Sequence, residues 1–187
     1  MKVKSLLYER YKKEILPALA KELKIKNPMQ IPAIKKVCLN IGMGSYLQRL
    51  NAKDYSFVEE NLTRIAGQKP VVRKSKRSVS NFKLREGQPV GISVTLRGHM
   101  AYNFIDKLIH VVYPRVRDFR GVSRDIFDKE GNCSIGLNDH TVFPEGVLAE
   151  DSRKIHGLQI TIVTSTDNAK HAETLLDMLD FPFKKKI

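Results

Sequence analysis

Residues 90–97 read VGISVTLR, and this stretch decides the fold class. Apolar side chains occupy every second position, and small, polar or basic residues stand between them, which predicts a strand buried on one face only. The stretch IKKVCLNI at 34–41 has the same pattern. Strands covered by helices on both faces would be continuously apolar, so we expect the sheet to keep one open face. This face should carry Lys36, Asn40, Thr95 and Arg97.

The rest of the chain supplies four predicted helices and three further strands. Apolar spacing predicts helices over 4–24, about 51–66, about 99–112 and 168–181. Pro17 predicts a kink or a split in the first helix, and Gly67 predicts a C-terminal cap for the second. Strands are predicted at 70–72, around 133–138 after the hairpin turn DKEGN, and at 157–165. This order favours one α+β domain over residues 1–187, with a mostly antiparallel sheet, helices packed on one face and the other face open.

A long basic loop, RKSKRSVSNFKLREGQ at residues 73–88, separates two of the predicted strands. Seven Lys or Arg residues and no acidic residue lie within 69–85, so repulsion should keep the loop extended and mobile. Ser78, Ser80 and Asn81 can hydrogen-bond to phosphate or ribose. Phe82 could stack on a base or anchor the loop on the core, and the sequence favours neither role. We therefore predict a projecting loop over about 73–89 that binds a polyanion.

Charge is unevenly distributed along the chain. Residues 1–124 hold 26 basic and 9 acidic side chains, whereas residues 125–187 hold 7 and 11. The basic part predicts a nucleic-acid partner, and the acidic last third predicts a partner of a different kind. The absence of a long apolar run argues against a membrane span, and the first residues resemble the start of a helix rather than a signal peptide. Cys38 and Cys133 are too few for a disulfide framework, so a reducing, cytoplasmic setting is expected.

The sequence offers no catalytic or metal-binding constellation. There is no HExxH and no CxxC motif, and we expect each of the five histidines at the surface or at its boundary: His99, His110, His140, His156 and His171. Gly42 and Gly44 hint at a dinucleotide turn, but the third glycine is missing, and close approach of two backbones explains them more simply. DKEGN lacks the spaced ligands of a calcium loop. We therefore predict a protein that is not an enzyme and holds no cofactor and no metal.

Several segments together resemble the bacterial large-subunit ribosomal protein number five, the family that binds 5S rRNA. They are LNIGMG (39–44), GQKPVVRKSKRSVSNFKLREGQPVG (67–91), VTLRG (94–98), YPRVRDFRG (113–121), the GN…G hairpin (131–136), FPE (143–145) and DFPFKKK (180–186). The match runs in the family's order over nearly the whole chain, and the segment around 140–157 differs in detail. The resemblance implies an antiparallel sheet covered by helices on one side, in agreement with the strand pattern.

The resemblance also implies two RNA sites and a protein contact. The open sheet face and the adjacent turns would bind 5S rRNA, and the basic loop would reach the elbow of the P-site tRNA. The connector 113–121 and the region around 140 would face the small-subunit head at its basic protein number thirteen. Further partners would be 23S rRNA and large-subunit proteins, in the cytoplasmic ribosome and without membrane contact. The acidic balance of residues 125–187 fits a protein partner better than a second RNA.

Asn40, Gln68 and Thr95 match family positions associated with the 5S rRNA contact. Lys36, Lys69 and Arg97 join them on electrostatic grounds alone. For the tRNA contact we expect the cations of the loop together with two residues that shape its tip or base. These are Arg73, Lys74, Lys76, Arg77, Lys83 and Arg85, with Asn81 and Phe82.

Two alternatives stay open from the residues alone. A general RNA-binding or chaperone module outside the ribosome would have the same basic charge, and it would bind 5S rRNA and unrelated structured RNA alike. An enzyme that uses a nucleotide near Gly42 and Gly44 is the weaker alternative, which a nucleotide-dependent thermal shift would support.

Overall fold

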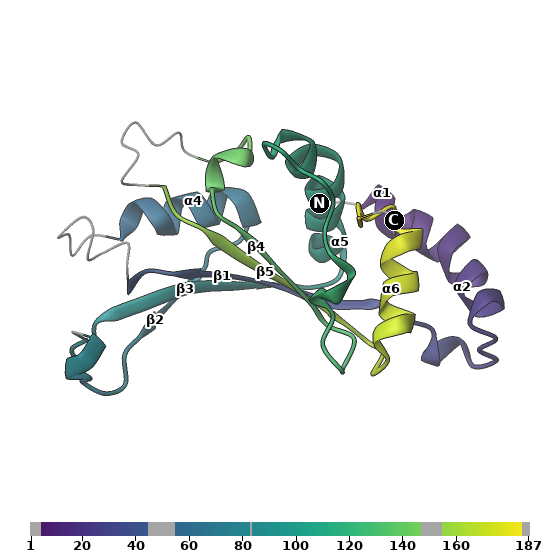
Figure 1. Cartoon of the computed structure of the whole chain (residues 1–187), viewed down its shortest axis with the longest axis horizontal. Helices are drawn as coiled ribbons and strands as arrows, with labels where there is room; N and C mark the ends of the chain where they lie inside the picture. The colour runs from purple at the N-terminus through teal and green to yellow at the C-terminus, as the bar shows by residue number, and fades with distance from the viewer. Residues whose placement is uncertain (1–4, 45–54, 83, 147–154, 185–187) are drawn as a thin grey trace. The chain divides into compact units, whose positions relative to one another are not determined.

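The chain forms an α+β fold with a five-stranded antiparallel sheet, as the strand pattern predicted (Figure 1). The computed structural model describes residues 5–44, 55–82, 84–146 and 155–184. The strand order is β2-β3-β1-β5-β4, which makes β2 and β4 the edge strands. Their bounds are β1 (Ile34–Gly42), β2 (Val71–Lys74), β3 (Pro89–Leu96), β4 (Cys133–Leu137) and β5 (Leu158–Thr164). All five coincide with the predicted strands to within a few residues.

The first predicted helix contains Pro17 but does not split. α1 (Leu6–Arg10), η1 (Tyr11–Ile15) and α2 (Leu16–Glu22) follow one another without a gap. η1 is π-helical, and Pro17 lies in the first positions of α2, where a missing N–H is tolerated. The same device recurs in the third helix, where α5 (His99–Lys107) passes through the π-helical η4 (Leu108–Val112) into the short η5 (Tyr113–Arg115). A widened turn therefore precedes a proline in both places.

The two other long helices begin and end close to the predicted positions. α4 (Ser56–Ala66) ends at Gly67, whose φ of 67° is left-handed and whose N–H donates to the Thr63 carbonyl at 2.8 Å, so the predicted cap is confirmed. The start predicted for this helix at 51–54 lies outside the described residues. α6 (Ala169–Met178) begins at Asn168, whose side chain accepts from the Lys170 N–H. No helix within the described ranges is long and apolar enough to cross a bilayer.

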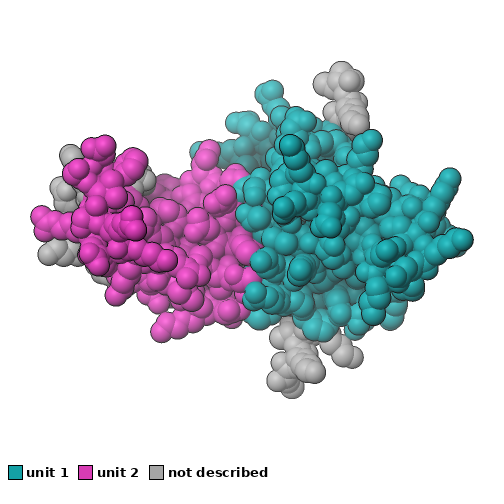
Figure 2. All heavy atoms as spheres, turned by 90° about the horizontal axis from the view of Figure 1, so that it is seen from below, with its two compact units in different colours: residues 1–37, 96–135, 161–187 teal, residues 38–95, 136–160 magenta. Residues whose placement is uncertain are grey.

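The described residues group into two compact units (Figure 2). Unit 1 comprises residues 1–37, 96–135 and 161–187, and unit 2 comprises residues 38–95 and 136–160. The single domain predicted over 1–187 stays a prediction. The candidate RNA-binding residues fall mainly in unit 2.

The core of unit 1 is built from the helices and the adjoining strand segments. Leu19, Val37, Leu108, Ile162 and Leu175 are all fully buried there. Burial of the helical side chains follows the apolar spacing that predicted the helices. Because these apolar side chains leave water together, they supply most of the stabilisation of the unit.

The C-terminal segment of unit 1 is attached by an ion cluster and a tight backbone contact. Arg124 in η6 (Arg124–Ile126) pairs with Glu173 and with Asp177, the latter at 2.9 Å, and its guanidinium stacks 4.9 Å from the Phe183 ring centre. Gly121 has a φ of 88°, and a Cβ there would lie 2.8 Å from the backbone nitrogen of residue 184. A side chain at position 121 is therefore excluded by both conformation and space.

Unit 2 carries α4 along one side of its strand segments (Figure 1). Val58, Leu62 and Ile65 of α4 are buried, as are the aliphatic residues of the strands: Leu39, Ile41, Ile92, Val94, Leu158 and Ile160. The residues between them on the strands are exposed or half-buried. The prediction that these strands are buried on one face only is confirmed within this unit.

Candidate nucleic-acid interface

The outward-facing side chains of β1, β3 and β5 in unit 2 form a polar surface opposite α4. We call this surface the polar sheet face and define it by Cys38, Asn40, Gly91, Ser93, Thr95 and Gln159, together with Arg73 of β2. Asn40 and Gln159 are exposed, and Ser93 and Thr95 are half-buried. Among the described residues no helix covers this side of the unit 2 strands (Figure 1). The face therefore presents amide, hydroxyl and guanidinium groups to solvent.

Hydrogen bonds between neighbouring strands fix the side chains of the polar sheet face. Asn40 Nδ2 donates to Gln159 Oε1 at 3.3 Å, which joins β1 to β5. Arg73 Nε donates to Ser93 Oγ at 3.2 Å, which joins β2 to β3. The face is thus a set of ordered donors and acceptors rather than a layer of independent side chains.

Thr95 belongs to the same ordered face. Its Oγ1 lies 3.9 Å from the Cys38 sulfur on β1, and both side chains are half-buried. The pairing leaves the threonine hydroxyl at the surface, where it has further hydrogen-bonding capacity.

The residues predicted to contact 5S rRNA occupy three different places. Asn40 and Thr95 lie on the polar sheet face, as expected from the alternation of β1 and β3. Gln68 and Lys69 are exposed and follow Gly67, in the turn between α4 and β2. Lys36 and Arg97 belong to unit 1, where Lys36 is half-buried on β1 and Arg97 is exposed just after β3.

The residues predicted to contact tRNA are divided between β2 and the following connection. Arg73 and Lys74 belong to β2, which ends two residues beyond the predicted strand 70–72. The connection itself runs over residues 75–88 and includes η3 (Ser80–Phe82). It exposes most of the predicted set, namely Lys76, Arg77, Asn81, Phe82 and Arg85. Lys83 lies outside the described residues.

The connection 75–88 has internal hydrogen bonds and is not extended as predicted. Ser75 N–H donates to the Gln88 carbonyl at 2.8 Å, and Gly87 N–H donates to the Ser75 carbonyl at 3.0 Å. Val79 and Leu84 form an isolated antiparallel bridge farther out. Gly87, with a φ of 78°, supplies the turn. Backbone and side-chain hydrogen bonding therefore outweighs the mutual repulsion of the cations in shaping this segment.

Phe82 points to solvent from η3. It is 68% exposed, so it does not anchor the connection on the core. The other role considered for Phe82, stacking on a base of a partner, is compatible with this position, because an aromatic face in solvent can stack on a base.

His140 and His156 form a buried stack in unit 2, so the expectation that every histidine lies at the surface or its boundary is wrong for these two. They are 0% and 3% exposed, with ring centres 4.1 Å apart and planes 7° from parallel. The backbone N–H of His156 donates to His140 Nδ1 at 3.4 Å, and His156 Nε2 lies 3.5 Å from Asn61 Nδ2 on α4. Burial, assisted by His140, lowers the pKa of His156 to about 4. The sequence carried no signal for this pair, because positions so far apart meet only through tertiary packing.

The thiols do not suggest a reactive site. Cys38 and Cys133 are both free. Burial raises the pKa of the Cys133 thiol to about 12, which keeps it protonated at neutral pH.

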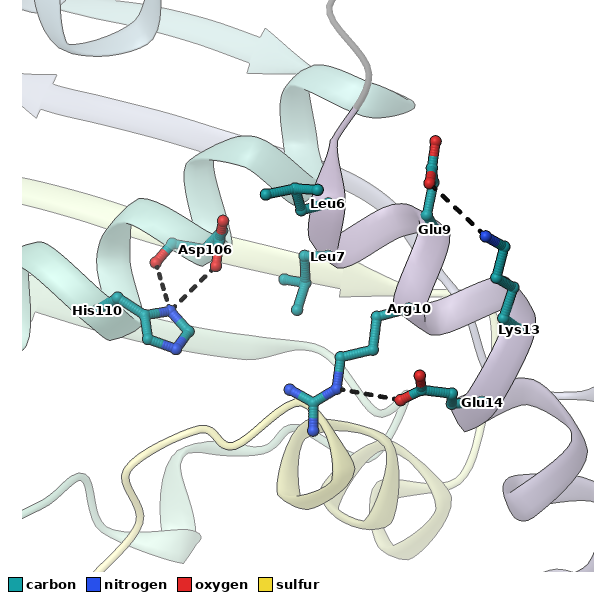
Figure 3. A pocket seen from close by; sticks show the side chains of 8 residues that line it. All are labelled: Leu6, Leu7, Glu9, Arg10, Lys13, Glu14, Asp106 and His110. Atoms are coloured by element: carbon teal, nitrogen blue, oxygen red, sulfur yellow. Dashed lines mark hydrogen bonds and ion pairs between the residues drawn. The ribbon is translucent and has the colours of Figure 1, made fainter.

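A shallow hollow in unit 1 is lined by side chains whose charges pair with one another (Figure 3). Three contacts of 3.0–3.9 Å each join a basic and an acidic group one helical turn apart on the same helical run. Its lining residues are Leu6, Leu7, Glu9, Arg10, Lys13, Glu14, Asp106 and His110. Since opposite charges compensate each other there, the hollow lacks the cationic excess that binds a polyanion.

Two family models together match most of the chain. The model described as ribosomal protein L5 matches residues 27–85, and the model described as the C-terminus of the same ribosomal protein family matches residues 89–183. The chain is also similar to proteins named large ribosomal subunit protein uL5. It is 49% identical over 96% of both chains to the one from Syntrophotalea carbinolica. It is 47% identical to the one from Helicobacter hepaticus, over 96% of this chain and 97% of that one. It is 44% identical to the one from Thermotoga sp., over 96% of both chains.

Proposed function

The chain belongs to the ribosomal protein L5 family, and from this premise we propose that its polar sheet face binds 5S rRNA and that the connection 75–88 contacts the P-site tRNA. The protein is a structural, non-enzymatic constituent of the large ribosomal subunit in bacterial, cytoplasmic ribosomes. Within the subunit it would join 5S rRNA to 23S rRNA and to neighbouring proteins. Through residues 113–121 and the region around 140 it would help to bridge to the small-subunit head.

The polar sheet face is the observation that carries the 5S rRNA proposal. It combines exposed amides, an exposed guanidinium and half-buried hydroxyls on strands whose other side is filled by the core. RNA in loops and ends offers base edges, 2′-hydroxyls and phosphates, which are the complements of these groups. Gln68 and Lys69 at the adjacent turn extend the same chemistry.

Charge supports the tRNA proposal for the connection 75–88. The connection holds four basic side chains and one acidic side chain, and of the basic ones Lys76, Arg77 and Arg85 are exposed. Such a segment gains affinity for any phosphate backbone by releasing condensed counterions. Phe82 adds a stacking surface among these cations.

The proposed bridge has a different electrostatic basis. Of the two proposed bridge segments, the region around 140 lies within residues 125–187, which hold 11 acidic and 7 basic side chains; this balance favours a basic protein over RNA as the partner of that region. Small-subunit head protein number thirteen is the basic protein proposed for this contact.

A mobility-shift titration tests the 5S rRNA proposal. The wild-type protein should prefer 5S rRNA over a structured RNA of matched length at about 0.15 M salt, where screening weakens non-specific attraction. The double variant Asn40→Ala, Thr95→Val should lose about tenfold or more in affinity, because two hydrogen-bonding groups disappear from the interface. Arg64→Ala is the matched control, since Arg64 is exposed on α4, on the opposite side of the strands.

The titration also separates this proposal from an RNA chaperone outside the ribosome. A chaperone would bind 5S rRNA and the matched RNA with similar affinity. Equal binding of the two RNAs by the wild-type protein would therefore refute the 5S rRNA proposal. Unchanged binding by the double variant would refute the assignment to the polar sheet face.

A loop replacement tests the tRNA proposal separately. Ser75 and Gly87 are already hydrogen-bonded to each other, so residues 76–86 can be replaced by a two-residue Asn-Gly turn without moving the strand ends. The variant should bind 5S rRNA nearly as well as the wild type. Ribosomes assembled with it should lose protection of the tRNA elbow in chemical footprinting. Collapse of 5S rRNA binding would show that the segment has been assigned to the wrong RNA.

A further inference from the structure

We propose that Arg73 binds a phosphate of 5S rRNA as part of the polar sheet face, and that Gly91 leaves the room in which the RNA backbone lies between Arg73 and Asn40. The inference rests on the proposed 5S rRNA function and deepens it. It also moves Arg73 from the tRNA-binding set to the sheet site.

The register of the β2–β3 pair places Arg73 on the sheet. Arg73 is directly opposite Gly91, and residues directly opposite each other on antiparallel strands point to the same side. Gly91, Ser93 and Thr95 are two residues apart on β3 and share its polar side, so Arg73 belongs to this side as well. The ladder becomes irregular only after Arg73, between it and Lys74. Arg73 is thus the last residue of β2 with regular sheet geometry.

A hydrogen bond holds the guanidinium of Arg73 against the sheet. Its Nε donates to Ser93 Oγ at 3.2 Å, which orients the planar group across β3. Within the described part of the chain, the Arg73 side chain has no other hydrogen bond and no ion pair, and it is exposed. Its two terminal NH2 groups are therefore available to donate to an anion. A guanidinium in this state suits the paired oxygens of a phosphate.

Gly91 creates a gap between two polar groups. Its strand neighbours are Arg73 on β2 and the Asn40 region on β1, and a Cβ on Gly91 would lie 3.9 Å from Asn40 Oδ1. Asn40 donates through Nδ2 to Gln159, so its Oδ1 is the atom that faces the gap. Two strand spacings separate Arg73 from Asn40, roughly 10 Å. A segment of RNA backbone fits across this width with its chain over the glycine.

The chemistry of the two sides differs in a way that fits ribose and phosphate. The guanidinium only donates hydrogen bonds, and a phosphate only accepts them. The Asn40 Oδ1 only accepts, and a ribose 2′-hydroxyl can donate to it. The gap therefore matches one phosphate and one 2′-hydroxyl of an RNA strand, which is a pairing that DNA lacks.

Mobility-shift titrations with charge-matched variants test the inference. Arg73→Ala should weaken binding to 5S rRNA about tenfold and lower the slope of log affinity against log salt by about one. Arg77→Ala removes the same charge from the connection 75–88, and it should stay within about twofold of the wild type. The affinity of Arg73→Lys should lie between those of Arg73→Ala and Arg77→Ala, because an ammonium keeps the charge but has no Nε–H for Ser93.

Gly91→Ala provides an independent arm, because it leaves every charge in place. The added methyl group would fill the gap and should weaken 5S rRNA binding about fivefold or more while the salt slope stays that of the wild type. The methyl group would lie 3.1 Å from the Ile41 carbonyl oxygen, so thermal unfolding is measured alongside to verify that the variant is folded at the binding temperature.

The outcomes separate this inference from the function on which it rests. If the wild-type protein does not prefer 5S rRNA, the proposed function fails. If it does prefer 5S rRNA and Arg73→Ala binds as the wild type does, the function stands and only this inference is overturned. Equal losses in Arg73→Ala and Arg77→Ala would also overturn it, because the arginine would then act only through general charge.

Discussion

Protonation of His156 should destabilise the folded protein as the pH falls below about 6.5. The imidazole is 3% exposed and lies flat against His140, and burial is the main cause that lowers its pKa to about 4. The Gly157 carbonyl and, to a smaller extent, Asp139 oppose this shift, and Asn61 lies next to the Nε2 nitrogen of the ring. A proton on this ring would place a charge where the surroundings favour the neutral form.

The size of the effect follows from the two pKa values. The unfolded chain holds His156 near its ordinary value of 6.5, whereas the folded protein holds it near 4. Between these values the unfolded state binds more protons, so stability is fully present above pH ~6.5 and is lost progressively as the pH falls towards ~4. Linkage then gives a loss of about 2 kcal/mol between pH ~7.5 and pH ~5. For a chain of this length the loss corresponds to a decrease in Tm of roughly 4–8 °C.

Thermal unfolding at the two pH values, followed by circular dichroism, measures this loss. His156→Phe keeps an aromatic ring against His140 but removes the titrating group, so its Tm should depend on pH less than that of the wild type by about the calculated amount. Leu62→Ala is the control for lower stability alone: Leu62 is fully buried, and its variant should unfold at a lower temperature while retaining the wild-type pH dependence. An unchanged pH dependence in His156→Phe would refute the reasoning.

Three further measurements probe other parts of the structure. Gly121→Ala should lower the free energy of unfolding by about 2 kcal/mol or more, since position 121 has a φ of 88° and no space for a Cβ. Gly136→Ala is the control and should be tolerated, because no described atom lies within 4 Å of its Cβ position. Thermal unfolding compares the two variants. Arg124→Gln should lower stability by about 1 kcal/mol by removing the ion pairs with Glu173 and Asp177, and this loss should shrink at high salt. Raising the salt should weaken 5S rRNA binding with a log–log slope of about −0.9 for each phosphate that the protein neutralises; a slope near zero would exclude phosphate contacts as the main source of affinity.

The parts of the fold that depend on local pattern were predictable from the sequence. The strand VGISVTLR has four aliphatic residues on one side, and burial of that side alone follows directly from the geometry of a strand. Gly67 likewise marked the end of a helix, because few other residues adopt the left-handed conformation at low cost. The polar residues Asn40 and Thr95 were placed on the outer side of the sheet by the same alternation.

The parts that depend on tertiary contacts were not predictable. β2 is an edge strand whose residues are mostly exposed, so Arg73 and Lys74 extend it without adding any apolar alternation to the sequence. His140 and His156 meet only after the chain has folded. Pro17 was expected to kink or split its helix, and the split does not occur, because the π-helical turn before it accommodates the ring within a continuous helical run.

The internal bridge between Val79 and Leu84 has a consequence for the strength of the loop contact. A chain that becomes ordered only on binding gives up roughly 1–2 kcal/mol of backbone conformational entropy for each residue that it fixes. The hydrogen bonds that join Ser75 to Gln88 and Gly87 already fix part of this segment in the folded protein, so part of the entropy is lost on folding and not on binding. A partner that meets the exposed cations of this segment therefore retains more of the electrostatic free energy as affinity. Substituting glycine for Val79 should accordingly weaken tRNA contact without removing a single charge.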